Sequence, residues 1–68
     1  MEPDIEIINI KVESLGLIDN LVTITRRDSV IIEKEIKGTM ATKLFIEGFK
    51  QGIELFCYEV EYNEDINI

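Results

Sequence analysis

The sequence contains no histidine and no tryptophan, and only one cysteine and one proline, in 68 residues. With Cys57 alone the chain cannot form an internal disulfide. One thiolate without histidine cannot build the closed four-ligand site of a structural zinc ion. Histidine is also the commonest general acid or base in enzymes. We therefore expect no disulfide, no metal and no cofactor, and we expect that the protein is not an enzyme.

Long apolar runs and basic residues are also scarce. No stretch approaches the roughly 20 apolar residues of a membrane helix, and the N-terminal segment lacks the positive charge of a signal peptide. Seven Lys and Arg stand against 14 Asp and Glu, which gives a net charge of −7. Nucleic-acid binding depends on basic residues that contact phosphates. This balance disfavours nucleic acid as the main ligand and favours a partner protein with a basic surface. The lack of a long apolar run predicts that the protein does not bind a membrane. A lone cysteine without an export signal predicts a cytoplasmic location.

The residues that are abundant are β-forming, and they fall into three short segments before one helix. Residues 5–13 alternate, with Ile8, Ile10 and Val12 on one face. Residues 20–26 and 30–37 predict a hairpin. A three-residue loop is favoured because it keeps the apolar side chains of both strands on one face, and a slip of one residue would invert every side chain. That loop pairs Ile24 with Ile32, Val22 with Lys34, and Arg26 with Val30.

A helix is predicted after Gly38, with Thr39 as its N-cap and Gly52 as its C-terminal stop. At 3.6 residues per turn, the apolar residues fill one half of the helical wheel, which we expect to pack on the sheet. Gly48 lies in the middle of that half and would let the helix approach the sheet closely. The half expected to be buried comprises Met40, Ala41, Leu44, Phe45, Gly48 and Phe49.

Residues 53–62 predict a fourth strand directly after the helix, and residues 1–4 and 63–68 predict loose termini. The order is β-β-β-α-β over one small domain, residues 1–68. The fold class is α+β: a four-stranded, mostly antiparallel sheet with one helix on one face. The fourth strand is expected to run parallel to the first. The sequence does not decide whether it lies beside the first strand or the third.

The fourth strand carries apolar residues on both faces, whereas one helix covers only one face. With Leu55 and Cys57 assigned to the helix side, the outer sheet face would expose an apolar patch, which is typical of an interaction surface. A twist of the strand that covers this face with Ile66 and Ile68 is the alternative. The predicted interface comprises Ile5, Ile7, Leu21, Ile31, Phe56, Tyr58, Val60 and Tyr62. The predicted acidic surface comprises Glu54, Glu59, Glu61, Glu64 and Asp65.

These features predict a small acidic protein-binding module without enzymatic activity, homodimeric through the outer sheet face, that acts as an inhibitor or adaptor on a partner protein. Two alternatives stay open. The first is a phage-type inhibitor that mimics nucleic acid with carboxylates and blocks a DNA-processing or defence enzyme. The second is a structural or assembly subunit that associates through its exposed strand edges.

Overall fold

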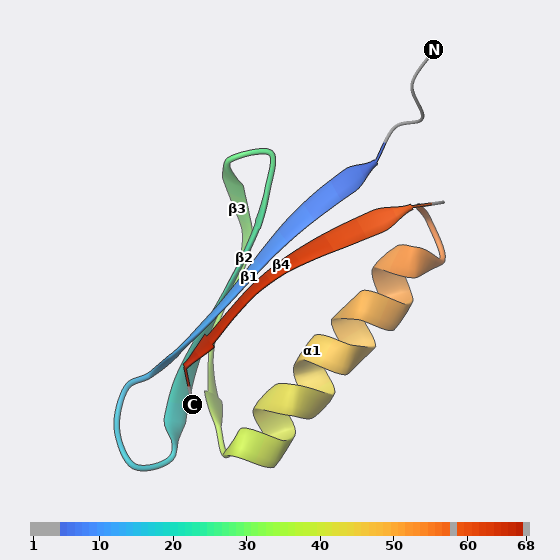
Figure 1. Ribbon diagram of the computed structural model, residues 1–68. Helices are drawn as coiled ribbons and strands as arrows, with labels where there is room; N and C mark the ends of the chain where they lie inside the picture. Colours follow the sequence, from blue (N-terminus) through green and yellow to red (C-terminus); the bar gives the residue numbers. More distant parts are fainter. Residues whose placement is uncertain (1–4, 58, 68) are drawn as a thin grey trace.

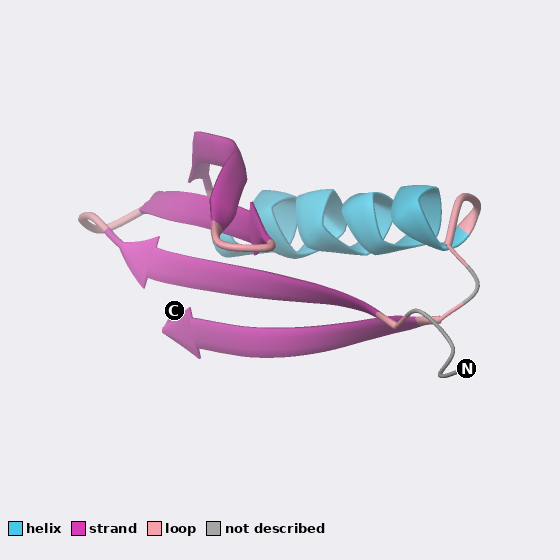
Figure 2. Ribbon diagram, turned by 90° about the horizontal axis from the view of Figure 1, so that it is seen from above, coloured by secondary structure: helices cyan, strands magenta, loops and turns pink. Residues whose placement is uncertain are grey.

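The computed structural model describes residues 5–57 and 59–67, which form four strands and one helix (Figure 1). The sheet has the order β3-β2-β1-β4, with β4 parallel to β1 and the other neighbours antiparallel. The helix lies along one side of the sheet (Figure 2). This arrangement confirms the α+β class and the β-β-β-α-β order, and it places the fourth strand beside the first. The elements are β1 (Glu6–Ser14), β2 (Asp19–Arg26), β3 (Ser29–Lys37), α1 (Thr39–Glu54) and β4 (Val60–Asn67).

The core is small and is centred on β1 and β2. The alternation in β1 buries Ile8, Ile10 and Val12, as predicted, because the helix covers that face. β2 adds Val22 and Ile24, and the helix contributes Ile46, which is 4% exposed. A chain of this length buries only about 60% of the surface that its unfolded form exposes, so few side chains can be fully enclosed. The partly buried side chains packed around this core are Ile32, Ile36, Phe49, Ile53, Val60 and Tyr62.

The β2–β3 hairpin has the predicted register near its base but a different tip. Ile24 lies opposite Ile32 and Val22 lies opposite Lys34, as predicted. The loop, however, consists of Arg27 and Asp28, whose φ angles are 52° and 64°. Two residues at positive φ match the twist of the strands better than a wider loop does. The register shift that follows places Arg26 opposite Ser29.

The extra residue of the hairpin is taken up by a bulge rather than by the loop. The ladder passes from Ile24–Ile32 directly to Thr25–Val30, which leaves Ile31 without a direct partner. The predicted pairing of Arg26 with Val30 is therefore wrong, and Val30 is 58% exposed instead of lying on the covered face. Lys34, a basic residue on that face, extends its ammonium group over the ring of Phe45 at 5.6 Å from the ring centre.

The helix begins and ends outside its predicted limits. Its N-cap is Gly38 at φ 93°, a conformation that glycine adopts without strain, and no side chain caps this end. The Gly38 N–H donates to the carbonyl of Ile18 at 2.7 Å, which anchors the helix start to the β1–β2 loop. At the other end the helix continues through Gly52 to Glu54. The prediction that Thr39 caps the helix and that Gly52 stops it is wrong.

The buried face of α1 is also different from the predicted face. Thr42 and Ile46 are buried, with Phe49 and Ile53 packed below them, at spacings of four, three and four residues. The Thr42 hydroxyl donates to the carbonyl of Gly38 at 2.8 Å and accepts from the side-chain amide of Asn20 at 3.1 Å, so its polar group is satisfied in the core. Four residues of the half predicted to be buried are exposed instead: Met40 (75% exposed), Ala41, Leu44 (66% exposed) and Gly48.

The fourth strand begins seven residues later than predicted. Residues 53 and 54 complete the helix, the chain then turns, and β4 occupies Val60–Asn67. The expected loose tail at 63–68 is therefore strand as far as residue 67. Leu55, predicted to be core, is 82% exposed, and Cys57 is half-buried. The expected loose end at 1–4 lies outside the described residues, as do Ile68 and Tyr58.

Candidate protein-binding site

An open hollow lies where the end of α1 meets the start of β4. The helix ends in a turn in which the N–H groups of Phe56 and Cys57 both donate to the carbonyl of Ile53, at 3.0 and 3.1 Å. The chain then reaches β4, where the N–H of Glu6 donates to the carbonyl of Glu59 at 3.0 Å. The start of β1 thus lies against the start of β4. The hollow has a volume of about 640 Å³ and is lined by Ile5, Glu54, Cys57, Glu59, Val60 and Glu61.

The lining of this hollow combines an apolar part with carboxylates. Ile5, Cys57 and Val60 supply the apolar part, and the acidic residues of the lining are Glu54 on the helix side of the edge strand β4 and Glu59 and Glu61 in the phase of its outer side. Glu59 and Glu61 are both exposed, and none of the three carboxylates takes part in an ion pair with another described residue. The hollow therefore keeps its negative charge, and it suits a ligand that has both an apolar stem and a cationic head.

One wall of the hollow is held by contacts between the helix and β4. The Tyr62 hydroxyl donates to the carboxylate of Glu54 at 3.1 Å, and the carbonyl oxygen of Lys50 lies 3.4 Å from the same hydroxyl. The Lys50 ammonium pairs with Glu64 and lies 5.0 Å from the centre of the Tyr62 ring. Burial and the neighbouring Glu54 carboxylate raise the pKa of Tyr62 to about 12, so the phenol remains a donor even at pH values at which an ordinary tyrosine ionises. Glu54 is thereby oriented before any ligand arrives.

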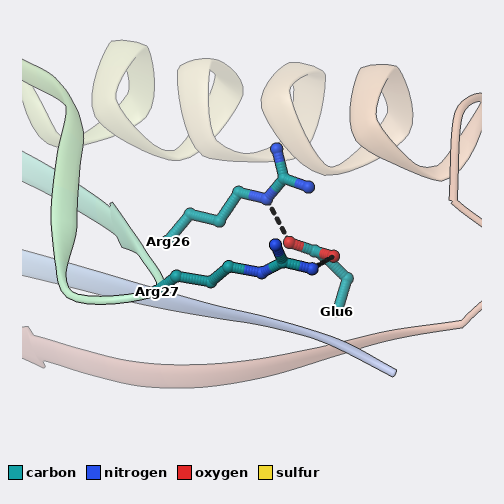
Figure 3. A network of polar contacts seen from close by, with 3 residues as sticks. All are labelled: Glu6, Arg26 and Arg27. Atoms are coloured by element: carbon teal, nitrogen blue, oxygen red, sulfur yellow. Dashed lines mark hydrogen bonds and ion pairs between the residues drawn. The ribbon is translucent and has the colours of Figure 1, made fainter. Parts of the chain in front are cut away.

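The two arginines at the hairpin tip have a carboxylate partner of their own. Arg26 forms a hydrogen-bonded ion pair with Glu6, and Arg27 lies 3.9 Å from the same carboxylate (Figure 3). The hydrogen bond from Arg26 lowers the pKa of Glu6 below its ordinary value. Both cations lie against Glu6, whose cross-strand neighbour is Val60 of the hollow lining, so the Glu6 carboxylate balances the charge of Arg26 beside the hollow.

The predicted interface residues do not form one surface. Ile7 and Leu21 lie on the outer sheet face, Ile31 lies at the β3 bulge, and Ile5 precedes β1. Val60 and Tyr62 lie on the opposite face, where they pack against the core, so their assignment to the outer face is wrong. The reason is the late start of β4, which changes the phase of the strand. Phe56 is 89% exposed in the turn after the helix, and Tyr58 lies outside the described residues.

The outer sheet face is mostly polar. Its cross-strand neighbours include Asn9 beside Thr25 and Thr23 beside Glu33. Asn63 donates from its side chain to the side chain of Asn9 at 3.1 Å. Ile7 and Leu21 are too isolated among these groups to make the apolar patch that the sequence predicts. The residues that line the shallow polar hollow on this face include Asn9, Lys11, Thr23, Thr25, Asn63 and Asp65.

The predicted acidic residues are divided between the hollow and its surroundings. Glu54, Glu59 and Glu61 line the hollow, Glu64 is paired with Lys50, and Asp65 lies on the outer face of β4. Sequence reasoning missed Cys57 as a lining residue, because it placed Cys57 in a buried strand. It also missed Leu55 as an exposed side chain. The spacing from Ile46 and Phe49 to Ile53 is the signal that could have shown that the helix continues past Gly52.

Comparisons with protein-family models, with curated proteins and with solved structures gave no significant match. Within residues 5–57 and 59–67, no three side chains of the metal-ligating types gather closely enough to hold an ion. No helix in the described part of the chain is long and apolar enough to cross a membrane.

Proposed function

We propose that this protein is a binding module without enzymatic activity that receives a basic side chain of a partner protein in the hollow at the start of the edge strand β4, beside the end of α1. The observation that carries the proposal is the combination of three carboxylates, Glu54, Glu59 and Glu61, with an apolar part of the same lining. Arginine and lysine side chains complement this lining, because each has an aliphatic stem for the apolar part and a positively charged head for the carboxylates. A partner with a basic surface is therefore the expected ligand.

Arginine fits the hollow better than lysine. The guanidinium group is planar and carries five donors, so it can serve two carboxylates at once, whereas an ammonium group acts as a compact point charge. Glu54 is already oriented by the Tyr62 hydroxyl, which reduces the ordering that binding requires. Phe56, 89% exposed beside the hollow, supplies an aromatic contact of the kind found in binding hot spots.

The overall charge supports the same ligand. Residues 51–68 contain five acidic residues and no basic residue, while the whole chain carries −7. Charge of one sign around a site steers oppositely charged partners toward it and raises their association rate. The rate is therefore expected to fall as salt is added.

The test uses an acetylated and amidated tetra-arginine peptide as the probe, with a tetra-citrulline peptide as its uncharged match. Binding is followed by NMR shifts of the backbone amides and by calorimetry. We expect the arginine peptide to shift amides near residues 54–61 and the citrulline peptide to shift none. We also expect Glu59→Gln/Glu61→Gln to weaken binding at least about tenfold, since two charge-assisted contacts are lost.

The matched control is Glu33→Gln/Glu35→Gln, which removes the same charge from exposed positions on β3. We expect this control to change the affinity by no more than about twofold, because charges beyond about 10 Å are largely screened in 0.1 M salt. Equal losses in the two double variants would mean diffuse attraction to the acidic chain, and that result would refute a specific hollow.

The nucleic-acid mimic remains a second candidate, and one observation favours it. Glu61 and Asp65 lie on the outer face of β4, Glu59 precedes them in the same phase, and β4 is an edge strand. Neighbouring residues on one face of a strand are about 6.6 Å apart, so Glu59 and Glu61 form an adjacent acidic pair, and Asn63 separates this pair from Asp65. Affinity capture that recovers a DNA-binding enzyme, released by added duplex DNA, would support the mimic. Recovery of a partner that DNA does not displace would exclude it.

A further inference from the structure

We infer that two copies of this chain associate through the outward face of α1, with their helices antiparallel. The face is a mainly apolar stripe, the outer stripe, made of the exposed residues Met40, Ala41, Leu44, Gly48 and the C-cap residue Leu55, with Gln51 as its polar member. At 3.6 residues per turn it lies on the far side of the helix from the buried residues Thr42, Ile46 and Phe49. The sheet therefore cannot cover it.

Because its core is small, the protein would gain stability if another chain buried the outer stripe. Only six hydrophobic residues are buried among the described residues, and the chain has one cysteine and no histidine. A domain of this size that lacks disulfides and structural metals commonly gains its stability by oligomerisation. Burial of the outer stripe against another chain would add to a core that the monomer cannot enlarge by itself.

The distribution of charge selects a second copy as the occupant. A symmetric dimer brings identical surfaces together, so a chain of charge −7 can associate with itself only where its surface is locally neutral. The outward side of the helix provides such a surface, because the exposed Lys43 and Glu47 balance each other there, whereas Lys50 and Glu54 contact Glu64 and Tyr62 of β4. A basic partner, in contrast, would be drawn to the acidic end of the chain rather than to this stripe.

The antiparallel arrangement also brings the narrowest part of each helix to the centre. A two-fold axis between residues 48 and 49 places Gly48 of one copy beside Gly48 of the second copy. Gly48 then lies at the crossing point, where an added Cβ would meet nothing within 4 Å in the monomer. The two helix backbones can therefore approach closely at the centre while Met40, Leu44 and Leu55 pack on either side.

The size of the helix predicts that the dimer is weak. Sixteen residues span about 24 Å, and at a width of about 10 Å the footprint is a few hundred Å², below the roughly 800 Å² per partner of a standard stable interface. We therefore expect a dissociation constant in the micromolar range or weaker, so the dimer must be sought at high protein concentration.

Sedimentation equilibrium of the full chain from about 10 µM to about 1 mM tests the inference. We expect a reversible monomer–dimer equilibrium, and we expect Leu44→Glu to raise its dissociation constant at least about tenfold. Leu44 is 66% exposed, so the monomer is expected to keep its circular dichroism spectrum. If this variant is unfolded, Met40→Lys takes its place, since Met40 is 75% exposed.

The matched control is Val30→Glu, which changes another exposed apolar side chain, 58% exposed, on the edge strand β3. We expect it to leave the dissociation constant within about twofold of the unmodified chain. A chain that stays monomeric up to about 1 mM, a dimer that survives Leu44→Glu, or a dimer that Val30→Glu disrupts would each overturn the inference. Disruption by Val30→Glu would indicate association through the strand edge instead.

Discussion

Replacement of Thr42 by valine tests how the helix is held on the sheet. Thr42 is fully buried, and its hydroxyl accepts a hydrogen bond from the side-chain amide of Asn20, which is itself 4% exposed. Valine keeps the shape but removes the hydroxyl. The carbonyl of Gly38 keeps a partner, because the backbone N–H of Thr42 also donates to it at 3.1 Å. The loss therefore falls on the Asn20 amide, which is left buried without this acceptor.

A buried donor without a partner costs about 1–3 kcal/mol. A domain of this length has a total unfolding free energy of only about 3–10 kcal/mol, so Thr42→Val should remove a large part of it. Urea denaturation followed by circular dichroism measures the change. In a thermal scan, each kcal/mol corresponds to a fall in Tm of about 4–8 °C. Thr42→Ser is the matched control, since it keeps the hydroxyl and removes one methyl group, at a cost of about 0.8 kcal/mol.

A double-mutant cycle with Asn20→Leu separates the hydrogen bond from packing. When both partners become apolar, no donor is left unsatisfied, so Asn20→Leu/Thr42→Val should cost less than the sum of the two single changes. We expect a coupling free energy of at least about 0.5 kcal/mol. Costs that simply add, or a Thr42→Val chain as stable as the unmodified one, would refute the reasoning that this pair sets the rotation of the helix.

Three further changes follow from the structure. Gly48→Ala should raise the unfolding free energy by about 1 kcal/mol in urea denaturation below the dimer range, because Gly48 lies mid-helix with open space where a Cβ would stand. Arg27→Asn with Asp28→Gly should raise it by roughly 1 kcal/mol in the same assay, because both positions have positive φ and the pair Asn-Gly suits that turn. In a Tyr58→Phe background, absorbance titration should show Tyr62 ionising near pH 12 in the folded chain. Because this pKa is raised on folding, its contribution to stability is complete below about pH 10 and is lost as the pH rises toward 12.

The strands near the core were predictable because their alternation is strict. Ile8, Ile10 and Val12 can share a buried face in only one phase, and a shift by one residue would bury polar groups instead. The register at the base of the hairpin was predictable for the same reason. The length of the loop at its tip was not, because a two-residue turn with a bulge and a three-residue loop give the same pairing of Ile24 with Ile32.

The rotation of the helix was not predictable from its wheel. Apolar residues occupy more than half of its circumference, so the wheel allows two faces, one with Met40 and Leu44 and one with Ile46 and Ile53. Contacts far apart in the sequence decide between them: Asn20 with Thr42 at the start and Tyr62 with Glu54 at the end. No local pattern contains these pairs.

The start of β4 was predicted too early because a glycine inside a helix destabilises it only slightly and does not have to end it. Gly52 costs about 1 kcal/mol relative to alanine, and the burial of Ile53 against the core offsets that cost. The polar residues 63–67 have low strand propensity, yet the parallel ladder with β1 holds them extended. The hollow lies at the turn between the helix and β4, where both of these predictions were wrong, so its arrangement could not be predicted from the sequence.

The two proposed surfaces should respond to salt with opposite signs. Binding of an arginine peptide in the hollow depends on attraction to Glu54, Glu59 and Glu61, and added salt screens that attraction and weakens binding. The helix dimer joins two chains that each carry −7 through a locally neutral apolar face. Salt screens the long-range repulsion between the chains and leaves the apolar contact intact, so the dimer should hold or tighten. Measurement of the peptide affinity and of the dimer dissociation constant over one series of salt concentrations therefore distinguishes the two surfaces. If salt weakened the dimer as well as the peptide complex, the helix contact would be electrostatic, and the outer stripe would not form it.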